Sequence, residues 1–257
     1  MRKLLLFVFL IIISLMGLYY FWITPKYTVP VFVYHSIGYE KGSYFVSPEN
    51  LEKQMEYIRR NGYDVITLDE LAKGIKSNKR FKRNEVVITM DDGYEDNYIY
   101  AYPIFKKFGF PATIFLATDY MGKKGFLNWD EIRLMSKNKI SFGGHTKSHL
   151  YLGSVNNIKI LREEIKGSKD KIEEETISPA DFFAYPVGGF NDTVEEIVKE
   201  SGYKGACTTN RGPSRLNNNP YQLKRIKITN SDISKPFSLK VKLSGYYNLF
   251  RRKKDSY

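Results

Sequence analysis

Short apolar strands alternate with helical segments from residue 29 to residue 229, and this alternation restricts the fold more than any other feature. The strand segments are rich in β-branched and aromatic residues, and helix start signals follow them. Such a pattern is typical of a mainly parallel sheet, either open or closed into a barrel. About seven such units favour a (β/α) barrel, in which functional groups collect at the carboxyl ends of the strands. The predicted strands lie at 29–37, 64–68, 85–90, 112–118, 140–146, 182–188, 205–209 and 223–229.

An almost unbroken apolar run from Leu4 to Ile23 follows Arg2 and Lys3. About 20 apolar residues are enough for a helix to cross a bilayer, and the preceding positive charges favour a cytoplasmic N-terminus. No small-residue cleavage pattern follows the run. We therefore predict an uncleaved transmembrane anchor, which leaves the rest of the chain outside the cell on the membrane. The alternative is a signal peptide, whose cleavage would release the protein as a secreted one.

The 257 residues therefore divide into an anchor or signal segment at 1–23, one domain at 24–235 and a basic tail at 236–257. The net charge of +12 indicates an anionic surface or polymer nearby. With an anchor present, a membrane face or a cell-wall polymer is favoured over nucleic acid, and we predict no nucleic-acid partner. The tail, with the positive run Arg251–Lys254, is interpreted either as a solvated segment or as a contact for anionic lipid or wall polymer.

Two adjacent carboxylates, Asp91 and Asp92, follow the predicted strand 85–90 in the sequence TMDDG. Two ionised neighbours that are buried and unpaired repel each other, and a bound cation or a shared proton removes the repulsion. Gly93 permits a sharp exit from the strand. The structural alternative is a pair of capping residues for the helix that follows.

Two of the three histidines, His145 and His149, stand four residues apart in the sequence HTKSH. Imidazole nitrogens are good ligands for zinc and its neighbours. Two histidines and one carboxylate leave coordination positions open for water and substrate, which is the composition of a catalytic metal site. Together with the Asp pair, they predict a divalent metal site. The alternative is a pair of exposed loop histidines.

Two further strand ends carry candidate residues. The sequence FAYPVG contains Tyr185 and Pro186 at a rigid turn, whose backbone N–H groups could face a developing oxyanion. His35, in YHSI, ends the first predicted strand. We interpret it either as a buried core histidine or as a general acid at the mouth of the same barrel.

Taken in order, these motifs resemble the polysaccharide deacetylases of the NodB-homology type, carbohydrate esterase family 4. The resemblance covers roughly residues 29–230. TMDDG resembles the TFDDG motif of the family, HTKSH fits its H-(S/T)-x-x-H motif, and the run from Asn97 to Thr118 fits the segment after TFDDG. Within the family the chain is most similar to the biofilm poly-N-acetylglucosamine deacetylases, through VPVFVYHSI, NWDEI and FAYPVGGFN.

The resemblance implies a distorted (β/α) barrel and a role for each motif residue. Asp91 corresponds to the general base, and the backbone N–H of Tyr185 to a donor for the oxyanion. The metal ligands correspond to Asp92, His145 and His149, with zinc expected first and cobalt, nickel or iron as alternatives.

The chain departs from the family in one motif. Many members carry a late Leu-x-x-x-His motif whose histidine is the general acid, but no histidine follows His149 here. The corresponding region contains Leu223 and Arg225 instead. The predicted acid is therefore His35.

The expected activity is a metal-dependent N-deacetylase, a hydrolase that acts on N-acetylglucosamine units of a polysaccharide outside the cell. Poly-β-1,6-N-acetylglucosamine is the first candidate substrate and peptidoglycan the second. Two interpretations compete with this one. The first is an inactive carbohydrate-binding module on the same fold, and the second is a membrane-tethered basic protein that binds nucleic acid or an anionic polymer.

Overall fold

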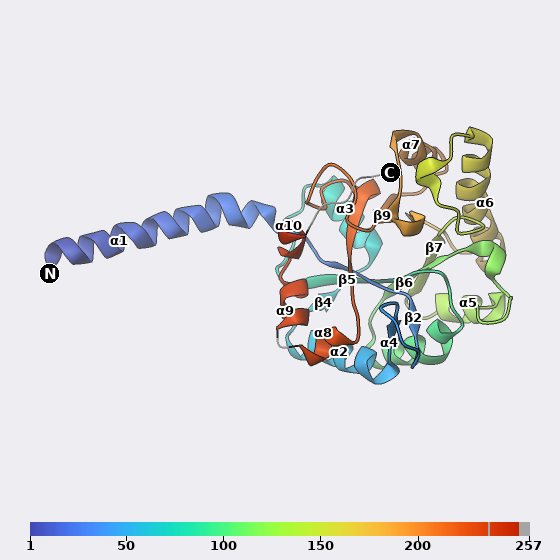
Figure 1. Ribbon diagram of the computed structural model, residues 1–257, viewed down its shortest axis with the longest axis horizontal. Coiled ribbons are helices and arrows are strands. Elements are labelled where there is room, and N and C mark those ends of the chain that lie inside the picture. Colours follow the sequence, from blue (N-terminus) through green and yellow to red (C-terminus); the bar gives the residue numbers. More distant parts are fainter. Residues whose placement is uncertain (236, 252–257) are drawn as a thin grey trace.

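The computed structural model describes residues 1–235 and 237–251. Its core is a closed barrel of parallel strands in the order β1-β10-β9-β8-β7-β6-β5, and β5 pairs back with β1 (Figure 1). The predicted (β/α) barrel is confirmed. The barrel strands are β1 (Val31–Tyr34), β5 (Glu85–Met90), β6 (Ala112–Leu116), β7 (Ile140–Gly144), β8 (Phe182–Ala184), β9 (Gly205–Thr208) and β10 (Leu223–Lys227).

Three short strands lie outside this ring. β4 (Asp64–Val65) pairs with the first two residues of β5. β2 (Ser36–Ile37) and β3 (Phe45–Val46) form a separate parallel pair directly after β1. The strand predicted at 29–37 is therefore two strands, which leaves His35 between them at the carboxyl end of β1.

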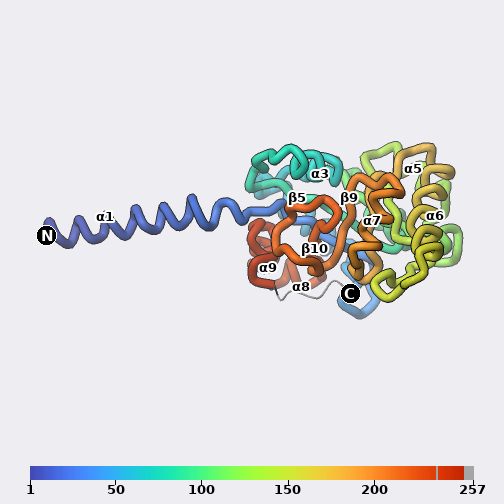
Figure 2. Tube along the Cα trace, turned by 90° about the horizontal axis from the view of Figure 1, so that it is seen from above, coloured from blue at the N-terminus to red at the C-terminus, as the bar shows by residue number. Residues whose placement is uncertain are grey.

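Helices surround the barrel on its outer side (Figures 1 and 2). The larger ones are α2 (Pro48–Arg60), α3 (Leu68–Lys76), α4 (Tyr102–Phe108), α5 (Trp129–Ser136), α6 (Ile158–Thr176) and α7 (Asp192–Glu200). Side-chain caps begin α2, α3, α5, α6 and α7, and α3 and α5 have full capping boxes. The chain enters α4 through a π-helical turn, η3 (Asn97–Ala101).

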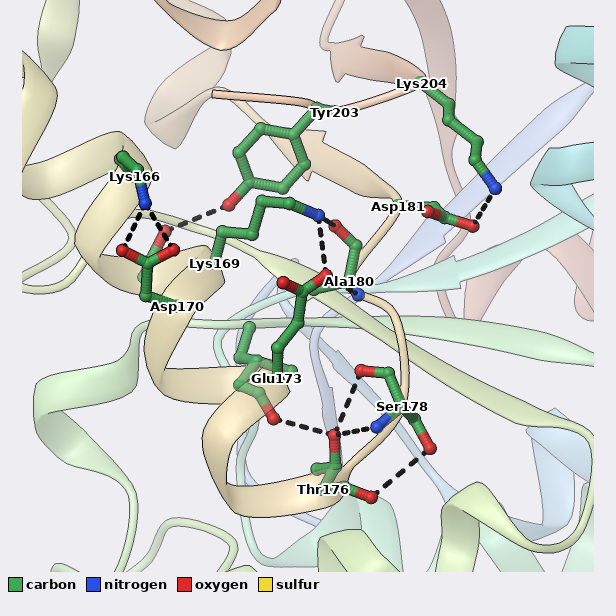
Figure 3. Close-up of polar contacts among 12 residues, drawn as sticks. Lys166, Lys169, Asp170, Glu173, Thr176, Ser178, Ala180, Asp181, Tyr203 and Lys204 are labelled. Atoms are coloured by element: carbon green, nitrogen blue, oxygen red, sulfur yellow. Dashed lines mark hydrogen bonds and ion pairs between the residues drawn. The ribbon is translucent and has the colours of Figure 1, made fainter. Parts of the chain in front are cut away.

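The longest helix around the barrel, α6, is fixed to it by a buried lysine (Figure 3). Lys169 Nζ donates to Glu173 Oε1 at 2.8 Å and to the carbonyl oxygen of Ala180 at 2.7 Å. Because Ala180 lies just before β8, these bonds join the helix to the start of that strand.

Alternate strand residues face opposite sides of the barrel wall. Val31, Val87 and Cys207 belong to a buried cluster inside the barrel, whereas Phe32 and Ile88 pack outward against the helices. The inner cluster also contains Leu68, Leu71 and Ala72 of α3. We conclude that α3 contributes its apolar face to this same cluster.

The N-terminal helix α1 (Arg2–Gly17) continues through two irregular turns to Lys26. It projects away from the barrel, and none of its residues is buried (Figures 1 and 2). Within the described residues, this is the one helix that is long and apolar enough to cross a membrane, although a signal sequence passes the same test.

The segment predicted as a basic tail at 236–257 is folded in its described part, and this corrects the interpretation as a solvated tail. After α8 (Ser231–Ser234), the chain forms α9 (Ser238–Leu243) and α10 (Tyr247–Phe250). Leu239 and Leu243 are buried in the outer core, which stabilises the segment against the barrel. Of the positive run Arg251–Lys254, only Arg251 lies within the described residues.

Candidate active site and metal site

A cavity of about 690 Å³ opens at the carboxyl ends of the barrel strands. All six residues singled out in the sequence line it: His35, Asp91, Asp92, His145, His149 and Tyr185. The strand ends of a parallel barrel converge at one face, so residues far apart in the chain meet there.

Asp92, His145 and His149 form one cluster in this cavity. The Nε2 atom of His145 lies 3.6 Å from Asp92 Oδ1, and the Nε2 atom of His149 lies 3.3 Å from the same oxygen. Within the described residues, one ligand atom from each of the three lies within 4.8 Å of the others. This separation places two nitrogens and one oxygen around a single point.

The chemistry of this cluster fits a divalent cation. His145 Nδ1–H donates to the carbonyl oxygen of Ala184 at 2.7 Å, which leaves Nε2 as the lone-pair donor. Burial lowers the pKa of His145, which favours the neutral imidazole that binds metals. Asp92 Oδ1 is buried and accepts no hydrogen bond from the described residues. A buried carboxylate oxygen without a donor is costly, and a bound cation compensates for it.

The loops that carry these ligands adopt strained backbone conformations. Asp92 has φ 73°, and Thr146 and His149 have φ 63° and 59°. Such left-handed conformations are uncommon outside glycine and concentrate at functional sites. Next to Asp92, Gly93 has φ 74°, and a Cβ there would lie 2.7 Å from the side chain of Leu116. The exit from β5 therefore requires glycine.

Asp91 is buried and held by Arg225. Arg225 donates from Nη1 to Asp91 Oδ1 at 2.5 Å and from Nη2 to Oδ2 at 2.7 Å, a two-bond fork. Burial alone would raise the pKa of Asp91, but the positive charge of Arg225, with His145 and His35, lowers it to about 2. Asp91 is therefore ionised at neutral pH and fixed in orientation.

Arg225 stands where the family motif has a histidine, and its bonds to Asp91 were not predicted from the sequence. The signal that could have found its role is the period of two in β10, because Leu223, Arg225 and Lys227 alternate with Lys224 and Ile226. Leu223 belongs to the cluster inside the barrel. Arg225 therefore points to the same side, where Asp91 continues the inward series of β5.

His35 also lies close to Asp91. Its Nε2 atom is 3.9 Å from Asp91 Oδ2. The ring of Tyr44 packs edge-on against the imidazole, with the two ring centroids 4.9 Å apart. Burial lowers the pKa of His35 to about 4, although the charge of Asp91 opposes this effect. The position suits a proton donor, whereas the resting imidazole is neutral at pH 7.

The backbone N–H of Tyr185, the predicted oxyanion donor, already has a hydrogen-bond acceptor in the barrel wall. Its N–H donates to the carbonyl oxygen of Cys207 at 3.0 Å, a bond between neighbouring strands. Pro186 has no N–H, so Val187 carries the next amide in the turn. Val187 lines the cavity at φ 56°, and its N–H donates to none of the described residues.

A smaller cavity adjoins the first and shares Asp92, Tyr94 and His149 with it. Three stacked aromatic rings form part of its wall. Phe126 lies between Tyr94 and Tyr120, with centroid separations of 5.3 and 5.0 Å. Aromatic faces of this kind offer apolar contact area beside polar groups.

Comparison with known proteins identifies the family. The family described as polysaccharide deacetylase matches residues 78–206. A Bacillus subtilis protein described as a polysaccharide deacetylase is 31% identical over 201 residues, which cover 78% of this chain and 71% of that protein. The poly-β-1,6-N-acetyl-D-glucosamine N-deacetylase of Staphylococcus aureus (strain MRSA252) is 31% identical over 212 residues, 77% of this chain and 73% of its own. The chain belongs to the polysaccharide deacetylase family.

The fold agrees with this assignment. The Streptococcus pyogenes deacetylase PplD, solved in complex with acetate, superposes with a TM-score of 0.76 at 27% identity, over 84% of this chain and 97% of that one. A polysaccharide deacetylase is a hydrolase that acts on carbon–nitrogen bonds other than peptide bonds. Enzymes of the family depend on a metal and act on polysaccharides that contain N-acetylglucosamine.

Proposed function

We propose that this polysaccharide deacetylase removes acetyl groups from N-acetylglucosamine units outside the cell, with a divalent metal held by Asp92, His145 and His149. The observation that carries the proposal is the juxtaposition of this cluster with the Asp91 carboxylate in one cavity. A metal bound there supplies Lewis-acid polarisation of the acetyl carbonyl and lowers the pKa of a bound water. Zinc suits two imidazoles and a carboxylate, and cobalt, nickel and iron are alternatives.

Asp91 acts as the general base in this mechanism. It takes a proton from the attacking water, and the Arg225 fork keeps its carboxylate in one orientation during the transfer. The N–H of Val187, in place of that of Tyr185, is the amide available to donate to the oxyanion as the carbonyl carbon becomes tetrahedral.

His35 is the proposed proton donor to the leaving amine. Its Nε2 atom lies 3.9 Å from the Asp91 oxygen, so a proton taken from water can pass to His35 over a short distance. The carbon–nitrogen bond breaks as the sugar nitrogen receives this proton. The products are acetate and a free amino sugar.

The proposal also names a substrate and a cellular location, each with one alternative. Similarity to the S. aureus enzyme supports poly-β-1,6-N-acetylglucosamine, and peptidoglycan is the alternative. The apolar N-terminal helix supports a single-pass anchor with the barrel outside the cell, and a cleaved signal sequence is the alternative. The presence of Asp91, Asp92, His145 and His149 together argues against an inactive carbohydrate-binding module.

The test measures metal content and acetate release with the full chain in detergent. Poly-N-acetylglucosamine oligomers, chitin oligomers and peptidoglycan serve as parallel substrates. We expect a chelator to abolish acetate release and zinc to restore it. Asp92→Asn, His145→Gln and His149→Gln should each lose bound metal and lower activity at least ~100-fold. Wild-type metal content in all three variants would show that the site is wrongly assigned.

Two further variants separate the base and the acid from the metal ligands. Asp91→Asn should keep the metal and lose ~100-fold or more of kcat, because an amide cannot accept the proton. His35→Gln should lower kcat with metal content unchanged. Asp170→Asn on the exposed face of α6 is the matched control. Acetate release that survives Asp91→Asn would contradict the mechanism.

A further inference from the structure

A basic segment lies between α3 and β5, at the end of the barrel opposite the catalytic cavity. Residues 76–83 read KSNKRFKR, with five positive side chains and no negative one. We call residues 79–83 the basic loop, and its four cations, Lys79, Arg80, Lys82 and Arg83, are all exposed. Positive charges held together on a folded surface attract a polyanion or an anionic surface.

Two carboxylates form ion pairs with the basic loop and balance only part of its charge. Lys79 Nζ lies 3.9 Å from Glu85 Oε1, and Lys82 Nζ lies 3.4 Å from Asp64 Oδ2. The two lysine side chains are 54% and 72% exposed. Exposed pairs of this kind are weak, so both lysines remain accessible to another anion.

The basic loop contacts the chain where the N-terminal helix reaches the barrel. Arg83 donates from Nη1 to the hydroxyl of Tyr19 and from Nη2 to Thr24 Oγ1, the second at 3.0 Å. The hydroxyl of Tyr27 donates to the carbonyl oxygen of Lys82 at 2.8 Å. The loop is therefore joined to the last turns of the helix and to the residues that follow it.

The aromatic residues of these last turns indicate the depth of the loop relative to a bilayer. Tyr19, Tyr20 and Trp22 end the apolar run of the helix. Tyrosine and tryptophan collect at the level of the lipid headgroups. Because Arg83 donates to the hydroxyl of Tyr19, the basic loop lies at this same level when the helix spans a membrane.

The opposite side of the connecting segment is also fixed. The N–H of Thr28 donates to the carbonyl oxygen of Gly245 at 3.0 Å. The ring of Tyr246 packs edge-on against that of Tyr27, with the two centroids 5.9 Å apart. Contacts on both sides of residues 27 and 28 restrict rotation of the barrel about the end of the helix, which keeps the basic loop next to the membrane surface.

We propose that the basic loop binds the anionic headgroups of the bilayer in which the N-terminal helix is anchored. The inference rests on the proposed membrane anchor and adds a second contact with the same membrane. The helix supplies the attachment, whereas the loop sets the orientation of the barrel. Anionic lipid supplies the charge that Asp64 and Glu85 leave unbalanced.

This orientation has a consequence for the catalytic cavity. Glu85 begins β5 beside the basic loop, and Asp91 follows the last residue of the same strand. Six residues of strand separate the two by roughly 20 Å. The cavity therefore opens at the end of the barrel directed away from the bilayer, where a polysaccharide outside the membrane can reach it.

The experiment uses the full chain in vesicles of neutral lipid, or of neutral and anionic lipid in equal parts. Cys207 is buried, so a thiol-reactive fluorophore labels an introduced cysteine selectively. Ser77→Cys places the label beside the basic loop. Lys159→Cys places it on α6, on the side of the barrel away from the anchor (Figures 1 and 2). A nitroxide on the lipid headgroups quenches a fluorophore that lies at the membrane surface.

We expect quenching at position 77 to be about threefold stronger in anionic than in neutral vesicles, and salt at about 0.5 M to remove the difference. Quenching at position 159 should be weak in both. Equal quenching at position 77 in the two kinds of vesicle would overturn the inference. A response of this label to soluble polyphosphate, without a response to anionic lipid, would overturn it in favour of an anionic polymer.

A charge variant then assigns the effect to the basic loop. Lys79→Gln, Arg80→Gln and Lys82→Gln, combined with the label at position 77, should lower quenching in anionic vesicles to about the level in neutral ones. Arg83 is retained because it contacts the helix. Lys159→Gln, Arg162→Gln and Lys166→Gln remove the same number of charges from α6, and this matched control should quench like the wild-type chain. Unchanged quenching in the loop variant would contradict the inference. If that variant fails to fold, the salt dependence of the parent chain gives the same decision.

Failure of the proposed anchor has a different signature. A full chain that floats with neither kind of vesicle would overturn the anchor and this inference together. A chain that floats with both, but whose label at position 77 does not distinguish them, would overturn this inference alone. Neither result depends on acetate release, so the proposed chemistry is tested separately.

Discussion

At the scale of single residues, Arg225 decides how Asp91 can act. Two short bonds from a buried guanidinium hold the carboxylate ionised and fix its direction. Lysine carries the same charge but has no planar fork, so it cannot reproduce both bonds. Both side chains of the pair are buried, so loss of one partner leaves the charge of the other without compensation.

Arg225→Lys tests this dependence. We expect kcat/KM for acetate release to fall about 10- to 100-fold, because the base is no longer held in one orientation. The free energy of unfolding in urea should fall by roughly 1–3 kcal/mol. Metal content should stay at the wild-type level, since Arg225 contacts Asp91 and not the ligand cluster.

Arg133→Lys is the control for this substitution, because Arg133 forms its ion pairs on the surface of α5. Its effect on both quantities should be small. Full activity in Arg225→Lys would show that the orientation of Asp91 does not limit the reaction.

At the scale of elements, one buried carboxylate contributes to holding the C-terminal helices against the barrel. Asp232 in α8 accepts hydrogen bonds from Lys242 Nζ at 2.7 Å and Ser238 Oγ at 2.6 Å, both in α9. It also accepts from the backbone N–H of Thr229, two residues after β10. The segment that brings Arg251 to the cavity is therefore joined to the barrel through Asp232.

Asp232→Asn should lower the free energy of unfolding by roughly 1–3 kcal/mol at pH 7, measured by urea denaturation. An amide keeps part of the hydrogen bonding but loses the charge that pairs with Lys242. Asp170→Asn, which removes an exposed pair with Lys166, should cost less than about 0.5 kcal/mol (Figure 3).

The effect of Asp232→Asn should also depend on pH. Burial alone would raise the pKa of Asp232, but its bonds with Lys242 and Ser238 more than offset this, so the folded-state pKa lies below the ordinary 3.8. The stabilisation is present above the unfolded value and is lost as the pH falls through the folded pKa. The difference between wild type and variant should therefore shrink below about pH 4. A difference that is independent of pH would rule out this ion pair as its source.

At the scale of the whole molecule, the N-terminal helix does not pack into the core of the barrel. The helix buries none of its residues, and Arg83 reaches it through Tyr19 and Thr24. Contacts with the folded domain begin at Tyr27, whose hydroxyl donates to the carbonyl oxygen of Lys82. At the next residue, the N–H of Thr28 donates to the carbonyl oxygen of Gly245.

Removal of residues 1–25 should therefore leave the barrel folded. We expect the full chain in the membrane fraction and the truncated chain in the soluble fraction after expression. The midpoint of thermal unfolding should be nearly unchanged, and kcat/KM on a short soluble oligomer should stay within about twofold, because the catalytic cavity contains no residue of the helix. Loss of folding on truncation would show that the helix is part of the core.

Local patterns were enough to predict the class of fold and the chemical groups of the site. Strand and helix periodicities are properties of neighbouring residues, and they predicted the parallel barrel. The adjacent Asp91 and Asp92, and the spacing of His145 and His149, are also local. A parallel barrel then requires their strand ends to meet at one face.

The remaining features depend on residues far apart in the chain, and only the tertiary structure decided them. Arg225 meets Asp91 across the barrel, and the amide of Tyr185 is engaged by Cys207 on the next strand. The neutral state of His35 follows from burial, which no local pattern reports. The basic segment at the C-terminus places Arg251 in the cavity because Leu239 and Leu243 pack against the barrel. The sequence identifies these side chains and their charges. The role of each one depends on the residue that it contacts and on its burial, which only the tertiary structure determines.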